Sequence, residues 1–253
     1  MGVVALNSPN MSFQLLDLDG VAEYLHLTRA EVEQRVKDQE IPFIRRGGRI
    51  VFNKEEIDGW ASRRILGLAD RPLDSYHEKS TRSTKNFLPH EAILPDMLAA
   101  GIIDPAMKSK TRSSVLRDLV ALAETTGKLT DPKALIASLE ARETLCSTAM
   151  PGGLALPHPR SPDPYLFDTS FLVVGRPVQE IHFGATDGEP TQLFFLLCCQ
   201  DDRLHLHTLA RLCLLALKTD ILAQLRAAPD AGTMRNSLIA AEAEVLAKMN
   251  PSA

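Results

Sequence analysis

The chain has 253 residues and a formal net charge of −4; 45% of its residues are hydrophobic and 24% are charged. This balance is ordinary for globular proteins and excludes wholesale disorder. The mildly acidic total argues against a protein that coats nucleic acid non-specifically, although one small domain can still bind DNA locally. The length fits one large domain or two small ones.

No stretch reaches about 18 consecutive apolar residues, so we expect no membrane insertion. The first residues lack a basic segment followed by a long apolar run, so no signal peptide is predicted. The four cysteines, Cys146, Cys198, Cys199 and Cys213, have no C-x-x-C spacing. We therefore expect reduced thiols and a cytoplasmic location. The histidines also lack the spacing of a metal site, and we expect neither a metal nor a cofactor.

Residues 14–66 form a first block that is dense in apolar positions. Apolar residues at helical spacing predict a short helix that ends near Leu27, and Thr28 is suited to cap a second helix over 28–39. A tight junction between two short helices indicates a helix-turn-helix. Two β-like runs, 42–46 and 49–53, flank Gly47 and Gly48 and predict a wing. A last short helix over 55–64 would be anchored by Trp60.

This succession resembles the excisionase-like, MerR-related winged-helix DNA-binding domain. The resemblance is carried by Ala22 and Leu25 before the turn, Ile41-Pro42 before the wing, Gly47-Gly48-Arg49 at its tip and Trp60 in the last helix. It implies that the second helix enters a major groove while wing arginines touch phosphates. The implied DNA-binding residues are Arg29 and Arg35 on the helix and Arg45, Arg46 and Arg49 on the wing.

The same second helix also carries Glu31, Glu33 and Asp38, which would repel phosphates. A protein-docking module therefore stays open as an alternative. Residues 67–86 are poor in aliphatic side chains and rich in polar ones, and such a segment buries too little apolar surface to offset its ordering entropy. We interpret it as a linker.

Apolar periodicity returns in residues 87–247. It predicts helices over 113–127 and 131–143, and a long helical stretch over 204–228 with a break near Asp220. The runs 170–175 and 191–199 have the length and composition of buried strands. Helices interleaved with buried strands indicate an α/β domain.

His158 stands between Pro157 and Pro159 at the end of a short apolar run. The prolines fix φ and block a helix, so the imidazole is presented on a stiff turn. A neutral imidazole can attack phosphorus near neutral pH because its unperturbed pKa is about 6.5. Taken alone, this pattern fits a structural turn residue at least as well.

Three segments together resemble the type 2 enzyme IIA domains of the bacterial phosphotransferase system, the fructose/mannitol and nitrogen-regulatory class. The match in the loop segment comprises Arg142, Glu143, Ser147, Thr148, Gly153, Ala155, Leu156, Pro157 and His158. The runs 181–197 and 203–212 match the other two family segments in order and spacing. The resemblance covers residues 87–228 and implies a mixed sheet flanked by helices.

The resemblance makes His158 the phosphoryl acceptor, His205 the second active-site histidine and Arg142 the active-site arginine. Phosphoryl transfer needs fixed positive donors for the equatorial oxygens, and a guanidinium is suited to that task. Further phosphoryl-binding support is expected from the hydroxyls of Ser147 and Thr148 and from the backbone near Gly152 and Gly153. His207 lies two positions after His205, so on a helix it points elsewhere.

Two departures from the family pattern concern the loop. Ala149 and Pro151 stand where the family commonly has glycines, and Pro151 removes one N–H donor. Gly152 stands where some mannitol-type members carry a glutamate. Phosphoryl affinity can differ for these reasons, while Arg142, His158 and His205 are all retained.

The two resemblances together predict a regulatory phosphocarrier. An HPr-type carrier would dock near the His158 loop and pass its phosphoryl group to that ring, which couples phosphorylation to partner or DNA binding. Such a chain is a phosphohistidine phosphotransferase component and not a free-standing turnover enzyme. Two alternatives remain: a sensor module that takes no phosphate, and a IIA component that hands phosphate to a sugar-specific IIB domain.

Overall fold

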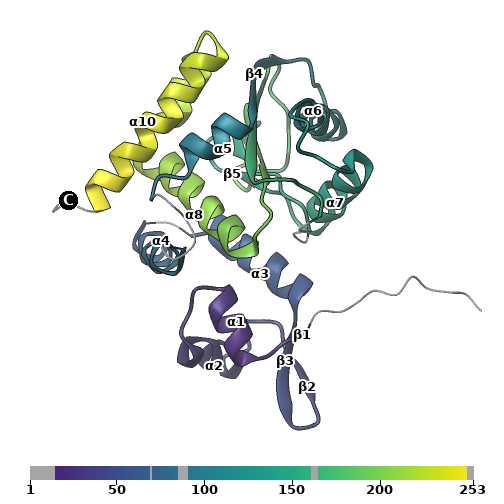
Figure 1. Cartoon of the computed structure of the whole chain (residues 1–253), viewed down its shortest axis with the longest axis vertical. Coiled ribbons are helices and arrows are strands. Elements are labelled where there is room, and N and C mark those ends of the chain that lie inside the picture. The colour runs from purple at the N-terminus through teal and green to yellow at the C-terminus, as the bar shows by residue number, and fades with distance from the viewer. Residues whose placement is uncertain (1–14, 69, 85–90, 161–164, 250–253) are drawn as a thin grey trace, which may run out of the picture.

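The computed structural model describes residues 15–68, 70–84, 91–160 and 165–249. The N-terminal part comprises the helices α1 (Leu18–Tyr24) and α2 (Arg29–Lys37), the strands β1 (Leu15–Leu16), β2 (Ile44–Arg46) and β3 (Arg49–Asn53), and the helix α3 (Lys54–Leu66). The strands form an antiparallel sheet in the order β1-β3-β2, and the β2–β3 hairpin projects from the body as a wing (Figure 1). The predicted winged helix-turn-helix is confirmed.

Local chemistry explains these boundaries. Thr28 accepts a hydrogen bond from the backbone N–H of Glu31, whose side chain accepts from the Thr28 N–H in return, so a capping box starts α2. The Asn53 side chain caps α3 through the N–H of Glu55. The wing turns at Gly47 and Gly48, whose φ angles of 56° and 78° only glycine adopts without strain.

The segment 67–86, interpreted above as a linker, differs in the structure because Asp70–Thr84 form helix α4. This helix packs against α8 (Asp202–Lys218), which is its main neighbour (Figure 1). Leu73 supplies one fully buried apolar side chain, and the rest of the buried face is polar, with His77 and Ser80 wholly buried. Composition therefore underestimates its packing, since these polar groups find partners inside the protein.

The C-terminal part is built on a five-stranded mixed sheet in the order β4-β7-β8-β6-β5. Its strands are β4 (Ile102–Met107), β5 (Ala149–Met150), β6 (Leu154–Ala155), β7 (Phe171–Pro177) and β8 (Leu193–Cys198). β4 is parallel to β7 and β6 is parallel to β8, whereas β7–β8 and β5–β6 are antiparallel. The predicted α/β class with a mixed sheet is confirmed.

Helices cover both faces of this sheet (Figure 1). On one side lie α6 (Arg112–Thr125) and α7 (Pro132–Leu145). On the other lie α5 (Leu94–Ala100), α8, α9 (Ile221–Ala227) and α10 (Ala231–Met249). The predicted helices over 113–127 and 131–143 correspond to α6 and α7, and the predicted break near Asp220 separates α8 from α9.

The alternation of side chains along the two central strands creates two separate cores. Toward α5 and α8 point Leu172, Val174, Leu193, Phe195 and Leu197. Toward α6 and α7 point Phe171, Val173, Phe194, Leu196 and Cys198. The first core continues without interruption into the N-terminal part, where it includes Val21 and Ile57. The winged helix and the sheet domain are thus packed together around shared apolar side chains.

Among the described residues, no helix is long and apolar enough to cross a membrane.

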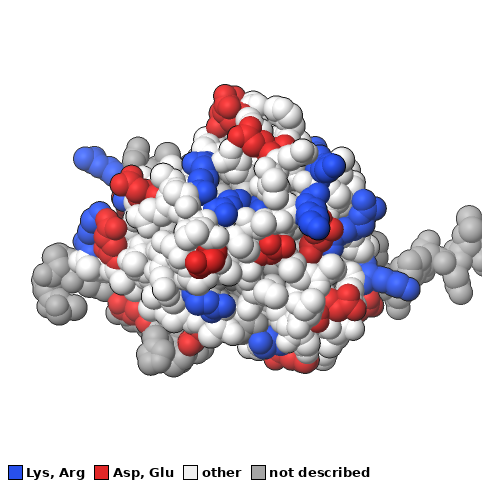
Figure 2. All heavy atoms as spheres, turned by 90° about the horizontal axis from the view of Figure 1, so that it is seen from above, with Lys and Arg blue, Asp and Glu red and all other residues white. Residues whose placement is uncertain are grey.

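The face of the C-terminal part that points away from the winged helix carries basic and acidic side chains in alternation (Figure 2). No single sign of charge dominates this face.

Candidate functional site

His158 lies in the extended segment that follows β6. The Leu156 N–H donates to the Thr148 carbonyl and the Pro157 carbonyl accepts from the Leu197 N–H, so strand-like pairing holds the backbone directly before the histidine. Only 2% of the residue is exposed. Its Nδ1 lies 2.8 Å from the carbonyl oxygen of Leu156. Because a carbonyl only accepts, the hydrogen sits on Nδ1 and Nε2 keeps its lone pair.

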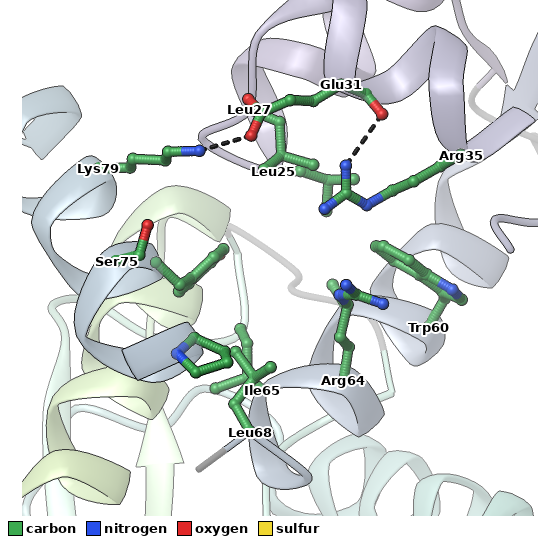
Figure 3. A pocket seen from close by; sticks show the side chains of 13 residues that line it. Leu25, Leu27, Glu31, Arg35, Trp60, Arg64, Ile65, Leu68, Ser75 and Lys79 are labelled. Carbon is green, nitrogen blue, oxygen red and sulfur yellow. Dashed lines mark hydrogen bonds and ion pairs between the residues drawn. The ribbon is translucent and has the colours of Figure 1, made fainter. Parts of the chain in front are cut away.

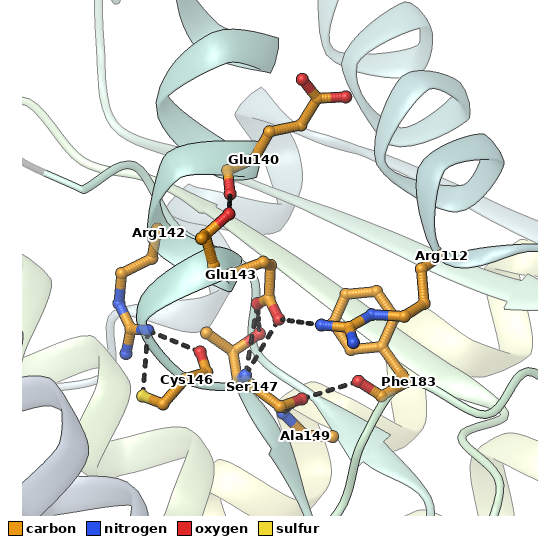
Figure 4. A network of polar contacts seen from close by, with 10 residues as sticks. Arg112, Glu140, Arg142, Glu143, Cys146, Ser147, Ala149 and Phe183 are labelled. Atoms are coloured by element: carbon orange, nitrogen blue, oxygen red, sulfur yellow. Dashed lines mark hydrogen bonds and ion pairs between the residues drawn. The ribbon is translucent and has the colours of Figure 1, made fainter.

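Arg142 meets that lone pair directly. It lies in the last turn of α7 and is 1% exposed. Its Nε donates to Nε2 of His158 at 3.1 Å, and its Nη1 donates to the carbonyl of Cys146 at 2.9 Å. Nη1 also lies 3.3 Å from the Cys146 sulfur (Figure 4). Nη2 is buried and has no hydrogen-bond partner among the described residues. The guanidinium thus leaves one donor without a partner beside Nε2 of His158.

His205 completes the set from the first turns of α8, which Asp201 caps through the N–H groups of Arg203 and Leu204. The ring centroids of His158 and His205 lie 4.8 Å apart. Arg142, His158 and His205, which the sequence resemblance groups together, are therefore neighbours in space.

Burial and positive neighbours keep both rings neutral. Desolvation, then Arg142 and His205, hold the pKa of His158 well below its usual value. Desolvation, then Arg142 and Lys54, lower the pKa of His205 to about 4. At neutral pH both imidazoles are therefore uncharged, which is the form that can act as a nucleophile or as a single-proton donor.

A second network of hydrogen bonds holds the segment between α7 and β5 (Figure 4). The Glu143 carboxylate accepts the Thr148 hydroxyl and backbone N–H, and it lies 3.5 Å from Arg112. The Ser147 hydroxyl donates to the Phe183 carbonyl at 2.8 Å and accepts from the Ala149 N–H. Both hydroxyls predicted to support the phosphoryl group are engaged here, so their contribution in this arrangement is to fix the loop.

Gly153 belongs to the β5–β6 turn. It precedes β6 while His158 follows it, so the two lie at opposite ends of that short strand. The Gly152 N–H donates to Asp187, and both glycines have positive φ, 85° and 75°. A Cβ at Gly153 would lie 2.9 Å from an Arg226 nitrogen and 3.2 Å from the Pro190 carbonyl. These contacts favour a structural role for the glycine pair.

The N-terminal part reaches the site through α3, which sequence reasoning did not foresee. Lys54 forms an ion pair with Asp202 at the start of α8, three residues before His205. Glu55 lies 3.5 Å from Arg160, two residues after His158. Arg203 meets Glu23 of α1 at 3.3 Å. No sequence signal identifies these pairs, because they join residues far apart in the chain.

The predicted DNA-binding arginines separate into two groups. Arg45, Arg46 and Arg49 lie exposed on the wing. Arg29 is exposed but paired with Asp19 at 2.6 Å and Glu33 at 2.9 Å. Arg35 is half-buried, and its Nη1 donates to the Glu31 carbonyl within the helix. The wing arginines are exposed and have no carboxylate partners among the described residues. On the helix, Arg29 is paired with carboxylates and Arg35 is half-buried.

His207 lies outside the site, as its spacing from His205 predicts. Its Nδ1 lies 2.8 Å from the Ser80 hydroxyl, and its ring stacks on His77 of α4 at a centroid distance of 5.0 Å. Arg211 donates to His77 Nε2 at 2.7 Å and binds Glu242 of α10. This buried cluster joins α4, α8 and α10.

Comparison with known proteins agrees with this geometry. A family model described as "Phosphoenolpyruvate-dependent sugar phosphotransferase system, EIIA 2" matches residues 97–240, and a helix-turn-helix domain model matches residues 15–65. A nitrogen regulatory protein of Bradyrhizobium diazoefficiens is 35% identical over 141 residues, which cover 54% of this chain and 89% of that protein. A fructose-specific EIIABC component of Bacillus subtilis is 26% identical over 134 residues, which cover 52% of this chain and 21% of that protein.

Among solved structures, the nitrogen regulatory protein IIA-Ntr from Neisseria meningitidis matches with a TM-score of 0.51 at 23% identity, covering 56% of this chain and 97% of that one. This likeness supports the fold of the C-terminal part. With the family model matching more than half of the residues, the chain belongs to the type 2 EIIA family of the phosphotransferase system and carries an N-terminal helix-turn-helix domain.

Proposed function

We propose that this protein is a regulatory phosphocarrier that accepts a phosphoryl group on Nε2 of His158 from a phosphohistidine carrier of the HPr type. One observation carries the proposal: the Leu156 carbonyl holds the hydrogen on Nδ1, which leaves the Nε2 lone pair facing the Arg142 guanidinium. Similarity to a nitrogen regulatory protein supports a regulatory role. We infer a cytoplasmic location, where four free thiols are stable.

In the transfer step, the hydrogen bond from Arg142 Nε to Nε2 breaks, and the freed Nε2 lone pair attacks phosphorus and forms a new N–P bond. The N–P bond of the donor breaks, and the donor imidazole leaves with its electron pair. Charge spreads over the three equatorial oxygens in the transition state, which needs fixed donors. The unpartnered Nη2 of Arg142 can supply one of them, and neutral His205 can supply an N–H.

The site is closed in the present arrangement, since His158 is 2% and His205 5% exposed. A docking carrier cannot reach a ring buried to this degree, so transfer requires the site to open. α3 packs against α8, and Lys54, Glu55 and Glu23 hold the winged helix to the edges of the site. We therefore expect phosphorylation to be coupled to movement of the winged helix away from α8.

The phosphoryl group also changes the charge balance at this edge. It adds about −1.5 to −2 charge at neutral pH. Asp202 at the start of α8 forms an ion pair with Lys54, so the added charge meets a carboxylate at this edge of the site. Repulsion then opposes reclosure and keeps the winged helix released from α8, so that it can meet a DNA or protein partner.

Intact-mass analysis after incubation with phosphoenolpyruvate, enzyme I and HPr tests the acceptor. We expect one phosphate on the wild type, none on His158→Ala, and one on His182→Ala, whose histidine is exposed and outside the site. A phosphate on His158→Ala would move the acceptor elsewhere. An unmodified wild type would favour a module that takes no phosphate, and onward transfer to a sugar-specific IIB domain would favour a transport component.

A further inference from the structure

A cavity of about 210 Å³ lies where α2, α3 and α4 meet, away from His158 (Figure 3). Its apolar lining comes from Leu25, Leu27, Ile65, Leu68 and Pro72, and Trp60 adds an aromatic wall. A cavity of about 150 Å³ already holds benzene. The space therefore accommodates a ring or a branched alkyl group with a short polar substituent.

The charge around this cavity is positive. Arg35, Arg64 and Lys79 line it, against the single carboxylate of Glu31. Lys79 forms an ion pair with Glu31 at 2.5 Å. Arg64 lies above the Trp60 ring and forms an ion pair with Glu40 at 3.9 Å. Arg35 pairs with no carboxylate in the described part of the chain. The Arg35 guanidinium thus leaves an uncompensated positive charge beside the apolar wall (Figure 3).

Two polar atoms in this lining are buried and lack a hydrogen-bond partner in the part of the chain that the structure describes. They are Nε of Arg35 and the hydroxyl of Tyr76. A buried donor without a partner costs about 1–3 kcal/mol. Both residues line the cavity, Arg35 from α2 and Tyr76 from α4, so the unpartnered Nε shows that the Arg35 guanidinium has donor capacity left beside the cavity.

We propose that this cavity binds a small organic carboxylate with an apolar body. The carboxylate takes donors from Arg35 and Arg64, and the apolar body packs on Trp60 and the leucines. A bound ligand then bridges α2 of the helix-turn-helix to α4. Its occupancy holds the DNA-binding unit against the rest of the protein.

Trp60 is the sole tryptophan of the chain, so its fluorescence reports on the cavity directly. The full-length protein is titrated with phenylacetate and with 4-methylpentanoate, and binding is confirmed by calorimetry. At least one carboxylate should give a saturable signal. Phenylacetamide, which has the same body without the charge, and inorganic phosphate, which has charge without the body, should each bind at least about tenfold more weakly.

Arg35→Gln should weaken the same binding about tenfold or more, while Arg45→Gln on the exposed wing should leave it unchanged. Absence of binding by both carboxylates would overturn the proposal. So would equal binding of phenylacetamide, which would indicate a merely apolar pocket, or equal binding of phosphate, which would indicate a general anion site such as a DNA backbone contact. These ligand comparisons use the wild type and remain decisive if a variant fails to fold.

Discussion

Arg142 spreads its donors over three tasks. Nε donates to Nε2 of His158, the proposed acceptor, Nη1 donates to the Cys146 carbonyl at the end of α7, and Nη2 has no partner among the described residues. A planar fork performs these tasks at once, whereas an ammonium group is a single point charge on a flexible stem. Charge alone therefore does not account for an arginine at this position.

Arg142→Lys keeps the positive charge and removes the fork. We expect the rate of His158 phosphorylation to fall about 10²-fold, the typical cost of removing one preorganised donor. Single-turnover phosphorylation by HPr, followed by intact mass, measures the rate. Arg117→Lys, on the exposed face of α6, is the matched control and should phosphorylate at the wild-type rate. An unchanged rate in Arg142→Lys would assign the residue to α7 structure only.

At the scale of elements, α4 packs against α8 through a buried histidine, His77. Burial and the charge of Arg211 lower the pKa of His77 to about 3. Facing it are His207 and Arg211 on α8, and Arg211 in turn binds Glu242 of α10. The hydrogen bond between His77 and Arg211 needs His77 neutral, because its Nε2 accepts from the Arg211 guanidinium.

This arrangement predicts acid sensitivity. The pKa of His77 is lower in the folded state than its ordinary 6.5, so the unfolded chain binds the extra proton first. The stabilisation is complete above pH 6.5 and is lost as the pH falls from there toward 3, by about 1.4 kcal/mol per pH unit for this group. Urea unfolding at several pH values measures the slope. His77→Gln should reduce the slope, while His182→Gln at an exposed position should not.

If the slope were the same in His77→Gln as in the wild type, His77 would be excluded as a source of the acid sensitivity. His207 in the same cluster also has a pKa held well below its usual value by burial, so part of the slope should persist in the variant. The expected result is therefore a smaller pH dependence of unfolding free energy in His77→Gln than in the wild type, not its disappearance.

Apolar periodicity was sufficient to predict α6, α7, β7, β8 and the break between α8 and α9, because each of these elements buries an apolar face. It was insufficient for α4, whose buried face consists largely of His77, Ser80 and Thr84. α8 supplies partners for His77 and Ser80, while the Thr84 hydroxyl donates to carbonyls of α4 itself, and a partner from a distant segment leaves no local trace in the sequence.

The candidate site also has features that the sequence could predict and features that it could not. The resemblance of the loop to the family pattern groups Arg142, His158 and His205 before any geometry is known. The Leu156 carbonyl that sets the tautomer is invisible in sequence, since every residue has a carbonyl. The inward position of Arg35 was also unforeseen, because it depends on α4 lying beside α2.

At the scale of the whole molecule, the winged helix and the IIA domain share one core, and their contact lies beside the acceptor. Two polar pairs at this contact lie outside the catalytic set: Glu23 with Arg203, and Glu55 with Arg160. Exposed pairs of this kind contribute about 0–1 kcal/mol each, so reversing both charges shifts a closed state toward opening without disrupting either core.

The double variant Glu23→Arg/Glu55→Arg should therefore accept phosphate from HPr about fivefold faster than the wild type, since about 1 kcal/mol changes a population by that factor. Glu33→Arg is the control, because Glu33 pairs with Arg29 inside the winged helix and forms no ion pair with the IIA domain among the described residues. Hydrogen exchange should rise at α3 and the start of α8 in the double variant alone. Equal phosphorylation rates together with faster exchange would mean that opening does not limit transfer, and the coupling between DNA-binding unit and acceptor would have to act after phosphorylation.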